Sequence, residues 1–325
     1  MFPTLFIFNP SIENNVNFGG GFYRPDIKAV SRYSNQLKNP MQFSVIVPFY
    51  NEERYITHCL DALTQQDFDP SQHEIIFVDN GSTDASCEIV KRYPQVKLLH
   101  EKKKGSYAAR NKGIRASQGE VIVFTDADCV VGRDWLKNIN SLLNRCRPDI
   151  VLGSHMFNND RSLILTMLAD YENVKIKYIL TKPLSKHYCY CFTNNMVVKS
   201  DIFKKTGLFS EIERGADTEF IHQYLSSVNV SKVTYLPEMS MKHLEIKNLI
   251  DWLKKQFIRG VNNERISSIV HYKMLGIRKK IEIFGYLVKQ YQYHYLNRLL
   301  LFMILSIGNL FYLCGRYKYR IDKLG

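Results

Sequence analysis

Short apolar runs alternate with helical patterns along the chain from Phe43 onward. The runs are FSVIV (43–47), EIIFV (74–78), VKLL (96–99) and VIVFT (121–125). Between the first two runs, Ile56, Leu60 and Leu63 fall at helical spacing on one face. Continuous apolar strands separated by helices are typical of a mostly parallel sheet covered on both faces. The pattern therefore predicts an α/β fold.

Polar clusters follow three of these runs. PFYNE follows the first run, DNGSTD the second and DAD the fourth, at 48–52, 79–84 and 126–128. Ligands of open α/β sheets bind beyond the carboxyl ends of the strands. We therefore expect the three clusters to form one shared site.

After residue 150 the pattern is looser. We expect a helix over 162–180 and then extended segments at MVVK, VTYL and MSMKH. From Leu244 onward the chain has a helical pattern and turns basic. This organisation predicts an N-terminal extension at 1–40, a main domain at 41–262 and a basic, apolar helical region at 263–325. The extension contains three consecutive glycines and does not have the pattern of a signal peptide.

The C-terminal region contains the apolar run LLLFMILSIGNLFYLCG between Arg298 and Arg316. As a helix this run is roughly 25 Å long, which is short against a hydrocarbon core of about 30 Å. Ser306, Gly308 and Asn309 interrupt it. We therefore expect a helix that lies in the membrane interface, where flanking Lys and Arg side chains meet anionic lipid. A transmembrane span and a helix packed on the main domain are the alternatives.

The composition agrees with a globular protein that has an anionic partner. The chain has 325 residues, 45% of them hydrophobic, and a formal net charge of +13. Such a charge favours nucleic acid, a phosphorylated substrate or an anionic membrane surface as the partner. Seven cysteines without zinc-type spacing suit a reducing compartment. We interpret Cys189 and Cys191 as small apolar residues.

Two carboxylates at the end of a buried strand, Asp126 and Asp128, repel each other unless a cation lies between them. Mg²⁺ and Mn²⁺ prefer oxygen ligands and leave open positions for phosphate oxygens. The pair can therefore hold such an ion against a diphosphate. The alternative is that Asp128 caps the helix that includes Trp135.

Tyr50 and Asp79 follow neighbouring predicted strands. An aromatic ring and a carboxylate can together bind a nucleotide base, the ring by stacking and the carboxylate by accepting a hydrogen bond from an imide N–H. Uracil suits this pair, and thymine offers the same edge. Asp-Asn-Gly-Ser is also favourable turn chemistry, and both readings can hold together.

The order and spacing of VIVPFYNEERYI, IIFVDNGSTD, GSYAARNKGI and VIVFTDADC resemble those of family 2 glycosyltransferases with the GT-A fold. FTNNMVVKSDIFKKTGLF, RGADTEF and MKHLEI continue the resemblance, which covers about residues 43–262. It implies a Rossmann-like mixed sheet and transfer of a sugar from a nucleotide-sugar to an acceptor hydroxyl, with inversion.

The resemblance also implies residue roles. Nucleotide-binding positions are Pro48, Tyr50, Glu52, Asp79, Arg110, Asn111 and Asp126. The expected metal ligands are Asp128, Asp126 and His243, with Mn²⁺ or Mg²⁺ as the cofactor. Asn195 corresponds to an asparagine near the donor or acceptor sugar.

RGADTEF contains the two candidates for the catalytic base, Asp217 and Glu219. They differ by roughly 200° around a helix, so one substrate atom cannot face both, and the family position favours Asp217. A carboxylate at Asp217 is also what helix capping would place there. Two departures from the family pattern are Asn80 in place of Asp and Ala216 in place of Glu.

The sequence thus predicts an inverting, metal-dependent glycosyltransferase, with a UDP-sugar as the favoured donor and a glycan or lipid-linked acceptor. The alternatives are a catalytically silent relative that scaffolds polysaccharide assembly, and a sugar nucleotidyltransferase. The latter generally has a Gly-rich basic loop after the first strand, where this chain has PFYNEERY. No nucleic-acid-binding motif is found, so we expect no nucleic-acid partner. We expect a cytoplasmic protein on the inner face of the cell membrane, attached as a peripheral or monotopic protein, and make no prediction about oligomeric state.

Overall fold

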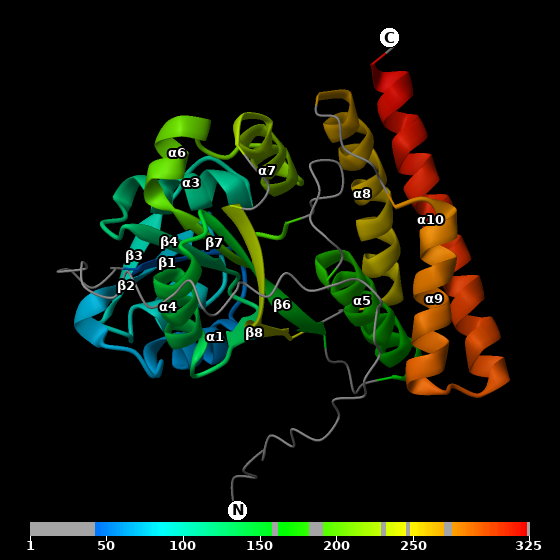
Figure 1. Ribbon diagram of the computed structural model, residues 1–325, viewed down its shortest axis with the longest axis horizontal. Helices are drawn as coiled ribbons and strands as arrows, with labels where there is room; N and C mark the ends of the chain where they lie inside the picture. Colours follow the sequence, from blue (N-terminus) through cyan, green and yellow to red (C-terminus); the bar gives the residue numbers. More distant parts are fainter. Residues whose placement is uncertain are drawn as a thin grey trace, which may run out of the picture.

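The structure is a computed structural model, and it describes residues 43–157, 162–181, 191–228, 232–244, 248–269 and 275–323. An eight-stranded sheet occupies one side of the molecule, and a group of long helices stands beside it (Figure 1). The predicted extension at 1–40 and Cys189 lie outside the described residues.

The strand order is β3-β2-β1-β4-β7-β6-β8-β5. The strand bounds are β1 Phe43–Phe49, β2 His73–Asp79, β3 Val96–His100, β4 Val121–Thr125, β5 Cys129–Val131, β6 Ile150–Phe157, β7 Asn195–Lys199 and β8 Val233–His243. The first four strands pair in parallel, and β7 pairs antiparallel with both β4 and β6. All four apolar runs and the mixed sheet expected from the sequence are therefore confirmed.

Helices cover both faces of the sheet. Their bounds are α1 Ile56–Thr64, the 3₁₀ turn η2 Pro70–Gln72, α2 Ser86–Val90, α3 Ser106–Ala116, α4 Trp135–Cys146, α5 Leu163–Thr181, α6 Ser200–Thr206, α7 Ala216–Ser227, α8 Leu249–Ile269, α9 Ile277–Tyr291 and α10 Tyr295–Asp322. The predicted helices at Ile56–Leu63 and 162–180 correspond to α1 and α5.

Alternation along the strands divides the sheet core into two layers. In β1, Val45 and Val47 pack with α1 and α4, whereas Ile46 faces the opposite layer with α3, α6 and α7. Successive side chains of a strand point to opposite faces, so an all-apolar strand fills both layers. The sheet is thus fixed from both sides, and its polar strand ends are held in place.

A third core joins α5, α8, α9 and α10 beside the sheet (Figure 1). Trp252, Ile283 and Leu301 are buried in it and come from three different helices. Residue 262, where the sequence pattern placed the end of the main domain, lies inside α8. The C-terminal helices therefore pack as one group with α5.

The helices α8 and α10 touch along glycines. A Cβ on Gly260 would lie 2.0 Å from the carbonyl oxygen of Tyr312, and a Cβ on Gly315 would lie 2.0 Å from that of Phe257. Only glycine allows two backbones to approach so closely. We call this contact, made by Gly260, Gly308 and Gly315, the glycine seam.

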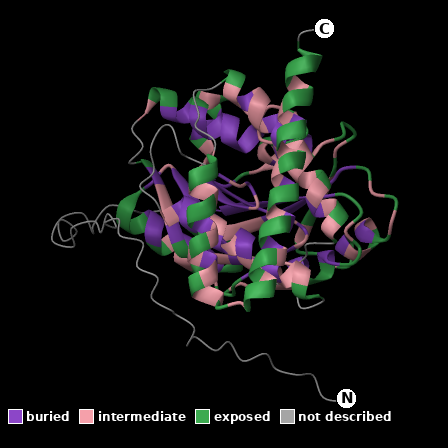
Figure 2. Ribbon diagram, turned by 90° about the vertical axis from the view of Figure 1, so that its right-hand side faces the viewer, coloured by how far each residue is buried: buried purple, intermediate pink, exposed green. Residues whose placement is uncertain are grey.

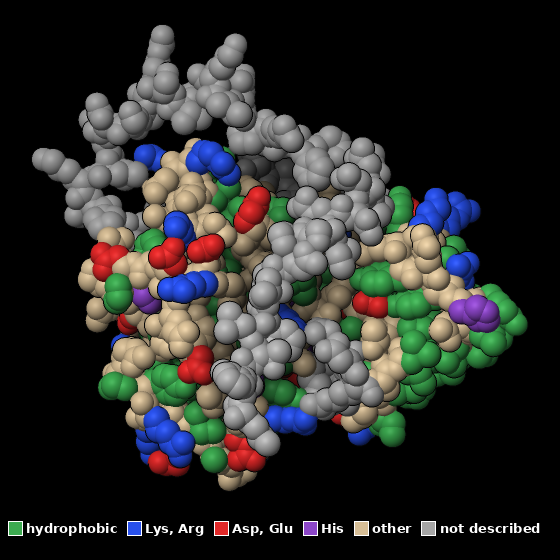
Figure 3. All heavy atoms as spheres, turned by 90° about the horizontal axis from the view of Figure 1, so that it is seen from below, with side chains coloured by type: hydrophobic (Ala, Val, Ile, Leu, Met, Phe, Trp, Pro, Cys, Tyr) green, Lys and Arg blue, Asp and Glu red, His purple; other side chains and the backbone are tan. Residues whose placement is uncertain are grey.

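The opposite side of α10 is apolar and exposed. Its exposed side chains include Leu299, Met303, Ile307 and Leu310, which recur every three or four residues. Hydrophobic side chains gather over α9 and α10 in Figure 3, and Figure 2 shows exposed residues along the outer side of these helices. Within the described part of the chain, α10 is the one helix long and apolar enough to cross a membrane, and 22% of its most apolar window is buried.

Candidate active site

A cavity of about 680 Å³ lies between the ends of the central strands and the helices α5, α8, α9 and α10. It brings together most of the residues that the sequence singled out. Those that line it are Pro48, Tyr50, Glu52, Arg110, Asp126, Asp128, Asp217 and His243. The expectation of one shared site at the strand ends therefore agrees with the geometry.

Asp126 follows β4 and is held by Arg110 of α3. The guanidinium Nη2 of Arg110 makes an ion pair with Asp126 Oδ1. Arg110 is buried, and its Nε atom has no hydrogen-bond partner among the described residues. Arg110 therefore fixes the orientation of the Asp126 carboxylate and adds a positive charge to the lining of the cavity.

Asp128 faces His243 at the end of β8. The Nε2 atom of His243 lies 3.3 Å from Asp128 Oδ2. Ligand atoms of Asp128, Cys129 and His243 all lie within 4.8 Å of one another. Burial raises the pKa of the Cys129 thiol well above its usual value, so it stays protonated and is a poor ligand. A carboxylate and an imidazole suit Mn²⁺ or Mg²⁺ when phosphate oxygens complete the shell.

Tyr50 and Asp79 lie side by side because Phe49 of β1 is in register with Asp79 of β2. The Asp79 carboxylate accepts hydrogen bonds from the Ser82 N–H at 2.9 Å and contacts His100 Nδ1 at 3.2 Å. Burial opposes its charge, but these hydrogen bonds outweigh burial and lower the pKa of Asp79. The group therefore stays an acceptor. The sequence analysis did not single out His100. It is the polar residue that ends β3, directly after Leu98 and Leu99.

Asp217 opens α7 at the cavity wall. Its Oδ1 accepts from the Thr218 N–H at 2.7 Å and its Oδ2 from the Thr193 N–H at 3.3 Å. Burial raises its pKa, although these hydrogen bonds and the charge of Arg110 act in the opposite direction. A buried carboxylate with a raised pKa is a better proton acceptor than an exposed one.

Four of the expected site residues do not line the cavity, and one of them, Asp79, directly precedes Asn80, which does. Glu219 is buried two residues further along α7, roughly 200° around the helix from Asp217, and is not among the described lining residues. Asn111 bonds to the backbone N–H and carbonyl of Phe209. Asn195 is fully buried, donates to Ser154 and Met239 carbonyls and accepts from Trp135 Nε1. The side-chain oxygen and nitrogen of both asparagines therefore make hydrogen bonds within the protein, and these bonds stabilise the fold.

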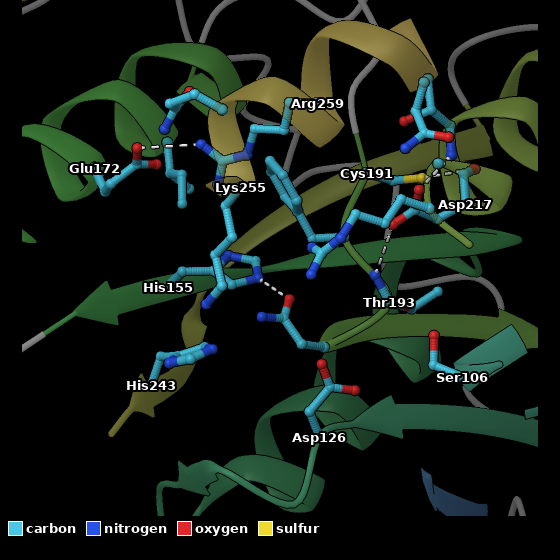
Figure 4. A pocket seen from close by; sticks show the side chains of 18 of the residues that line it. Ser106, Asp126, His155, Glu172, Cys191, Thr193, Asp217, His243, Lys255 and Arg259 are labelled. Atoms are coloured by element: carbon cyan, nitrogen blue, oxygen red, sulfur yellow. Dashed lines mark hydrogen bonds and ion pairs between the residues drawn. The ribbon is translucent and has the colours of Figure 1, made fainter. Parts of the chain in front are cut away.

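The neighbouring Asn194 lies in the cavity instead. Its Oδ1 is 2.6 Å from Nε2 of His155, a buried imidazole of β6 (Figure 4). Burial lowers the pKa of His155 to about 4, so the ring is neutral at physiological pH. No motif in the sequence pointed to His155. Asn194 stands next to Asn195 in FTNNM, and only the strand register distinguishes the two.

The fold and the acidic strand ends define the class. The structure resembles the mannosyltransferase PcManGT of Pyrobaculum calidifontis, with a TM-score of 0.56 at 17% identity over 88% of this chain and 89% of that one. It resembles TarS of Staphylococcus aureus with a TM-score of 0.50 at 19% identity, over 87% and 92% of the two chains. The protein therefore has the GT-A fold of glycosyltransferases, as predicted.

The sequence comparison identifies the family. Residues 44–207 match the family described as glycosyl transferase family 2, and the chain belongs to it. Relatives include the glycosyltransferase AglE of Haloferax volcanii, 33% identical over 173 residues, which are 51% of this chain and 55% of AglE. The poly(ribitol-phosphate) β-N-acetylglucosaminyltransferase TarS of Staphylococcus aureus is 25% identical over 207 residues, 61% of this chain and 34% of TarS. The chain thus spans about half of one relative and about a third of the other, and the predicted family is confirmed.

Proposed function

We propose that the protein transfers a sugar from a nucleotide-sugar, with UDP as the favoured nucleotide, to a hydroxyl of a glycan or lipid-linked acceptor. The observation that carries the proposal is the joint placement of Asp128, His243 and Asp217 in one cavity. The neighbours support it, since structures of PcManGT and TarS contain GDP-mannose with Mn²⁺ and UDP, respectively. The base-binding end, with Tyr50 next to Asp79, suits uracil.

In this proposal Asp217 acts as the base. Its carboxylate takes the proton of the acceptor hydroxyl, and the freed oxygen forms a bond to the anomeric carbon. The bond between that carbon and the diphosphate oxygen breaks on the opposite face, so the configuration is inverted. The electron pair of the broken bond leaves with the nucleoside diphosphate.

Asp126, Asp128 and His243 serve the leaving diphosphate. Asp128 and His243 would hold a divalent cation, and Asp126, fixed by Arg110, faces the same space. When bound, the cation supplies positive charge to the diphosphate oxygens as they become more negative. Tyr50 and Asp79 position the base, and Pro48 and Glu52 line the approach to it.

The test is a panel of nucleotide-sugars in the presence of Mn²⁺. A donor that binds the folded state raises the melting temperature, and UDP release follows its transfer or hydrolysis. Release of UDP above background supports the enzyme. A catalytically silent scaffold would show the thermal shift without release, and a nucleotidyltransferase would release pyrophosphate from a sugar phosphate and UTP.

We further propose that α10 attaches the protein to the inner face of the cell membrane. Its exposed apolar residues lie on one side, while the other side is fixed to α8 by the glycine seam. An apolar stripe on one side of a helix whose other side is packed on protein suits a helix that lies in the membrane interface. Removing α10 would also expose the third core, so substitution is the better test.

The substitutions Leu299→Gln and Leu310→Gln, made together, should lower sedimentation with vesicles of phosphatidylcholine and phosphatidylglycerol. Each removes an exposed apolar side chain that would insert into lipid, worth about 1.5–3 kcal/mol when fully buried. Met156→Gln, at an exposed apolar position of β6 outside α10, serves as the control. Equal sedimentation of the double variant and the unaltered protein would contradict the attachment.

A further inference from the structure

The cavity has two walls of opposite charge. The sheet wall carries the carboxylates of Glu52, Asp126, Asp128, Glu213 and Asp217, with Arg110 and Arg214 as its cations. The wall formed by α5, α8 and α9, which we call the helical wall, carries Lys175, Lys255, Arg259 and Lys280. Among the described lining residues of these helices, Glu172 is the single carboxylate. On the helical wall, four positive charges therefore stand against one negative charge.

Glu172 pairs with two of these cations. Its carboxylate forms an ion pair with Lys175 of the same helix, and its Oε1 lies 3.3 Å from Nη1 of Arg259 on α8 (Figure 4). Glu172 is 3% exposed. Burial opposes its charge, and the two cations outweigh burial and lower its pKa to about 2. One buried carboxylate thus balances one of the four charges.

The other two cations of the helical wall are Lys280 and Lys255. Lys280 Nζ donates a hydrogen bond of 2.6 Å to Asn309 Oδ1 and lies 4.6 Å from the ring centroid of Tyr312. Lys255 projects from α8 toward His155 and His243 (Figure 4). Asn309 and Tyr312 belong to α10, so the C-terminal helix itself orients one cation of the wall.

Concentrating cations in a buried wall is costly without an anion. Burial lowers the pKa of Lys175 to about 8, and it also lowers the pKa of Lys280. The carboxylates that balance these cations lie on the opposite wall of the cavity, so the helical wall by itself still attracts an anionic ligand. Charge-assisted hydrogen bonds to lysine and arginine are the strong ones, and a neutral sugar could not accept them as well as a phosphate does. The wall therefore fits a phosphate or diphosphate group.

The exposed apolar surface lies on α10, which packs against α8 of this wall. Leu305 of α10 and Leu275, just before α9, line the cavity, and Leu299, Met303 and Leu310 lie on the outer side of α10. A ligand with a phosphate head and an apolar tail matches both the cations of the wall and the apolar side chains beside it.

We propose that the acceptor is a membrane lipid whose phosphate or diphosphate group binds between Lys175, Lys255, Arg259 and Lys280. The inference rests on the proposed transferase function and names the acceptor class for the same cavity. The group bound at the helical wall is retained during transfer, and it holds the lipid-linked hydroxyl in front of Asp217.

Binding of two amphiphiles with the same tail tests this. Dodecyl phosphate and dodecyl β-glucoside are titrated into the full chain, below their micelle-forming concentrations, with saturating UDP and Mn²⁺ to fill the donor site. We expect the phosphate to bind at least ~10-fold more tightly, the size expected for one or two charge-assisted hydrogen bonds. Equal affinity of the two amphiphiles would overturn the proposal.

Lys280→Gln removes one charge but keeps a donor for Asn309, and Lys255→Gln provides a second variant if the first one folds poorly. Each should reduce dodecyl phosphate binding about 10-fold and leave dodecyl glucoside binding unchanged. Lys289→Gln, an exposed position on α9 away from the cavity, is the matched control. An equal loss of affinity for UDP in the variants would mean general damage to the cavity and would overturn the assignment.

Two further arms separate the sources of phosphate. Inorganic phosphate that binds as tightly as dodecyl phosphate would show a free-anion site and contradict the lipid. Displacement of dodecyl phosphate by UDP would assign the cations to the donor diphosphate instead. Failure of the proposed transferase function can be distinguished from failure of this inference. If no donor gives UDP release, the transferase function fails, whereas the preference for dodecyl phosphate over dodecyl glucoside is measured independently.

Discussion

The two walls of the cavity differ in charge and in the way their side chains are held. On the sheet wall, Asp126 pairs with Arg110, Asp128 faces His243, and Asp217 accepts hydrogen bonds from the N–H groups of Thr218 and Thr193. On the helical wall, the Arg259–Glu172 and Lys280–Asn309 contacts join different helices. The first wall is thus preorganised by residues anchored at the ends of the sheet strands, whereas the second depends on the packing of α5, α8, α9 and α10. Fixed side chains such as those of the sheet wall favour a reaction centre, because the reacting groups are held in position. A wall that depends on helix packing suits a surface that admits a large ligand.

Asp128→Ala gives the largest expected effect and belongs to the sheet wall. The change removes a metal-binding carboxylate, and loss of several kcal/mol of charge stabilisation corresponds to about a 1000-fold lower transfer rate. The rate of UDP release is measured across a Mn²⁺ titration. Asp67→Ala, an exposed carboxylate paired with Lys137, is the control. Full activity of the unaltered protein in excess chelator would show that transfer does not require a metal ion at the sheet wall.

Asp217→Asn follows in size. Asparagine caps a helix nearly as well as aspartate but cannot accept the proton, so folding should be preserved while transfer falls at least ~100-fold. Because the base must be ionised and burial raises its pKa, activity of the unaltered protein should fall with decreasing pH at a higher pH than an ordinary carboxyl would allow. The rate is measured against pH with donor binding as a parallel readout. A large loss in Glu219→Gln, with Asp217→Asn unaffected, would reverse the assignment.

Asp79→Ala tests whether base recognition is separate from the reaction centre. Loss of one hydrogen bond to a charged acceptor should weaken UDP binding about 10-fold. Since the base is bound alike in the ground and transition states, kcat should change less than KM for the donor. Calorimetric titration with UDP and steady-state kinetics give the two values. Unchanged affinity with reduced kcat would assign Asp79 to the chemical step.

Tyr50→Ala gives the smallest expected effect. The ring is 51% exposed, so it offers one stacking face to a base and little else. Aromatic pairs contribute about 0.5–1.5 kcal/mol, which corresponds to roughly a five-fold loss of UDP affinity. Tyr50→Phe keeps the ring and should bind UDP as the unaltered protein does. If Tyr50→Phe loses as much as Tyr50→Ala, the hydroxyl rather than the ring makes the contact.

The same difference explains what could be predicted from the sequence. The buried strands and the polar clusters after them were visible because each motif is a short stretch whose residues stay together in space. Parallel strands then align these stretches, so Asp79 lies next to Tyr50, and Tyr50 and Asp126 line the same cavity. The α/β fold, the family and most of the sheet wall followed from this regularity.

The helical wall could not be found in that way. Lys175, Lys255 and Lys280 lie on three helices, and each fits an ordinary helix surface when its own segment is considered alone. Their convergence depends on how Trp252, Ile283 and Leu301 pack in the third core. The assignment of Asn195 shows a smaller limit, because a shift of one position along β7 decides whether Asn194 or Asn195 reaches the cavity.

The glycine seam fixes the position of α10 relative to α8. Because the backbones of α8 and α10 are in contact at Gly260 and Gly315, neither helix can slide or tilt without the other. In the proposed membrane attachment, α8 and the Arg259 it carries would stand at a constant height above the lipid surface. The seam would then act as a ruler, and acceptors whose reactive hydroxyl lies much nearer to the bilayer, or much farther from it, would be excluded by distance alone.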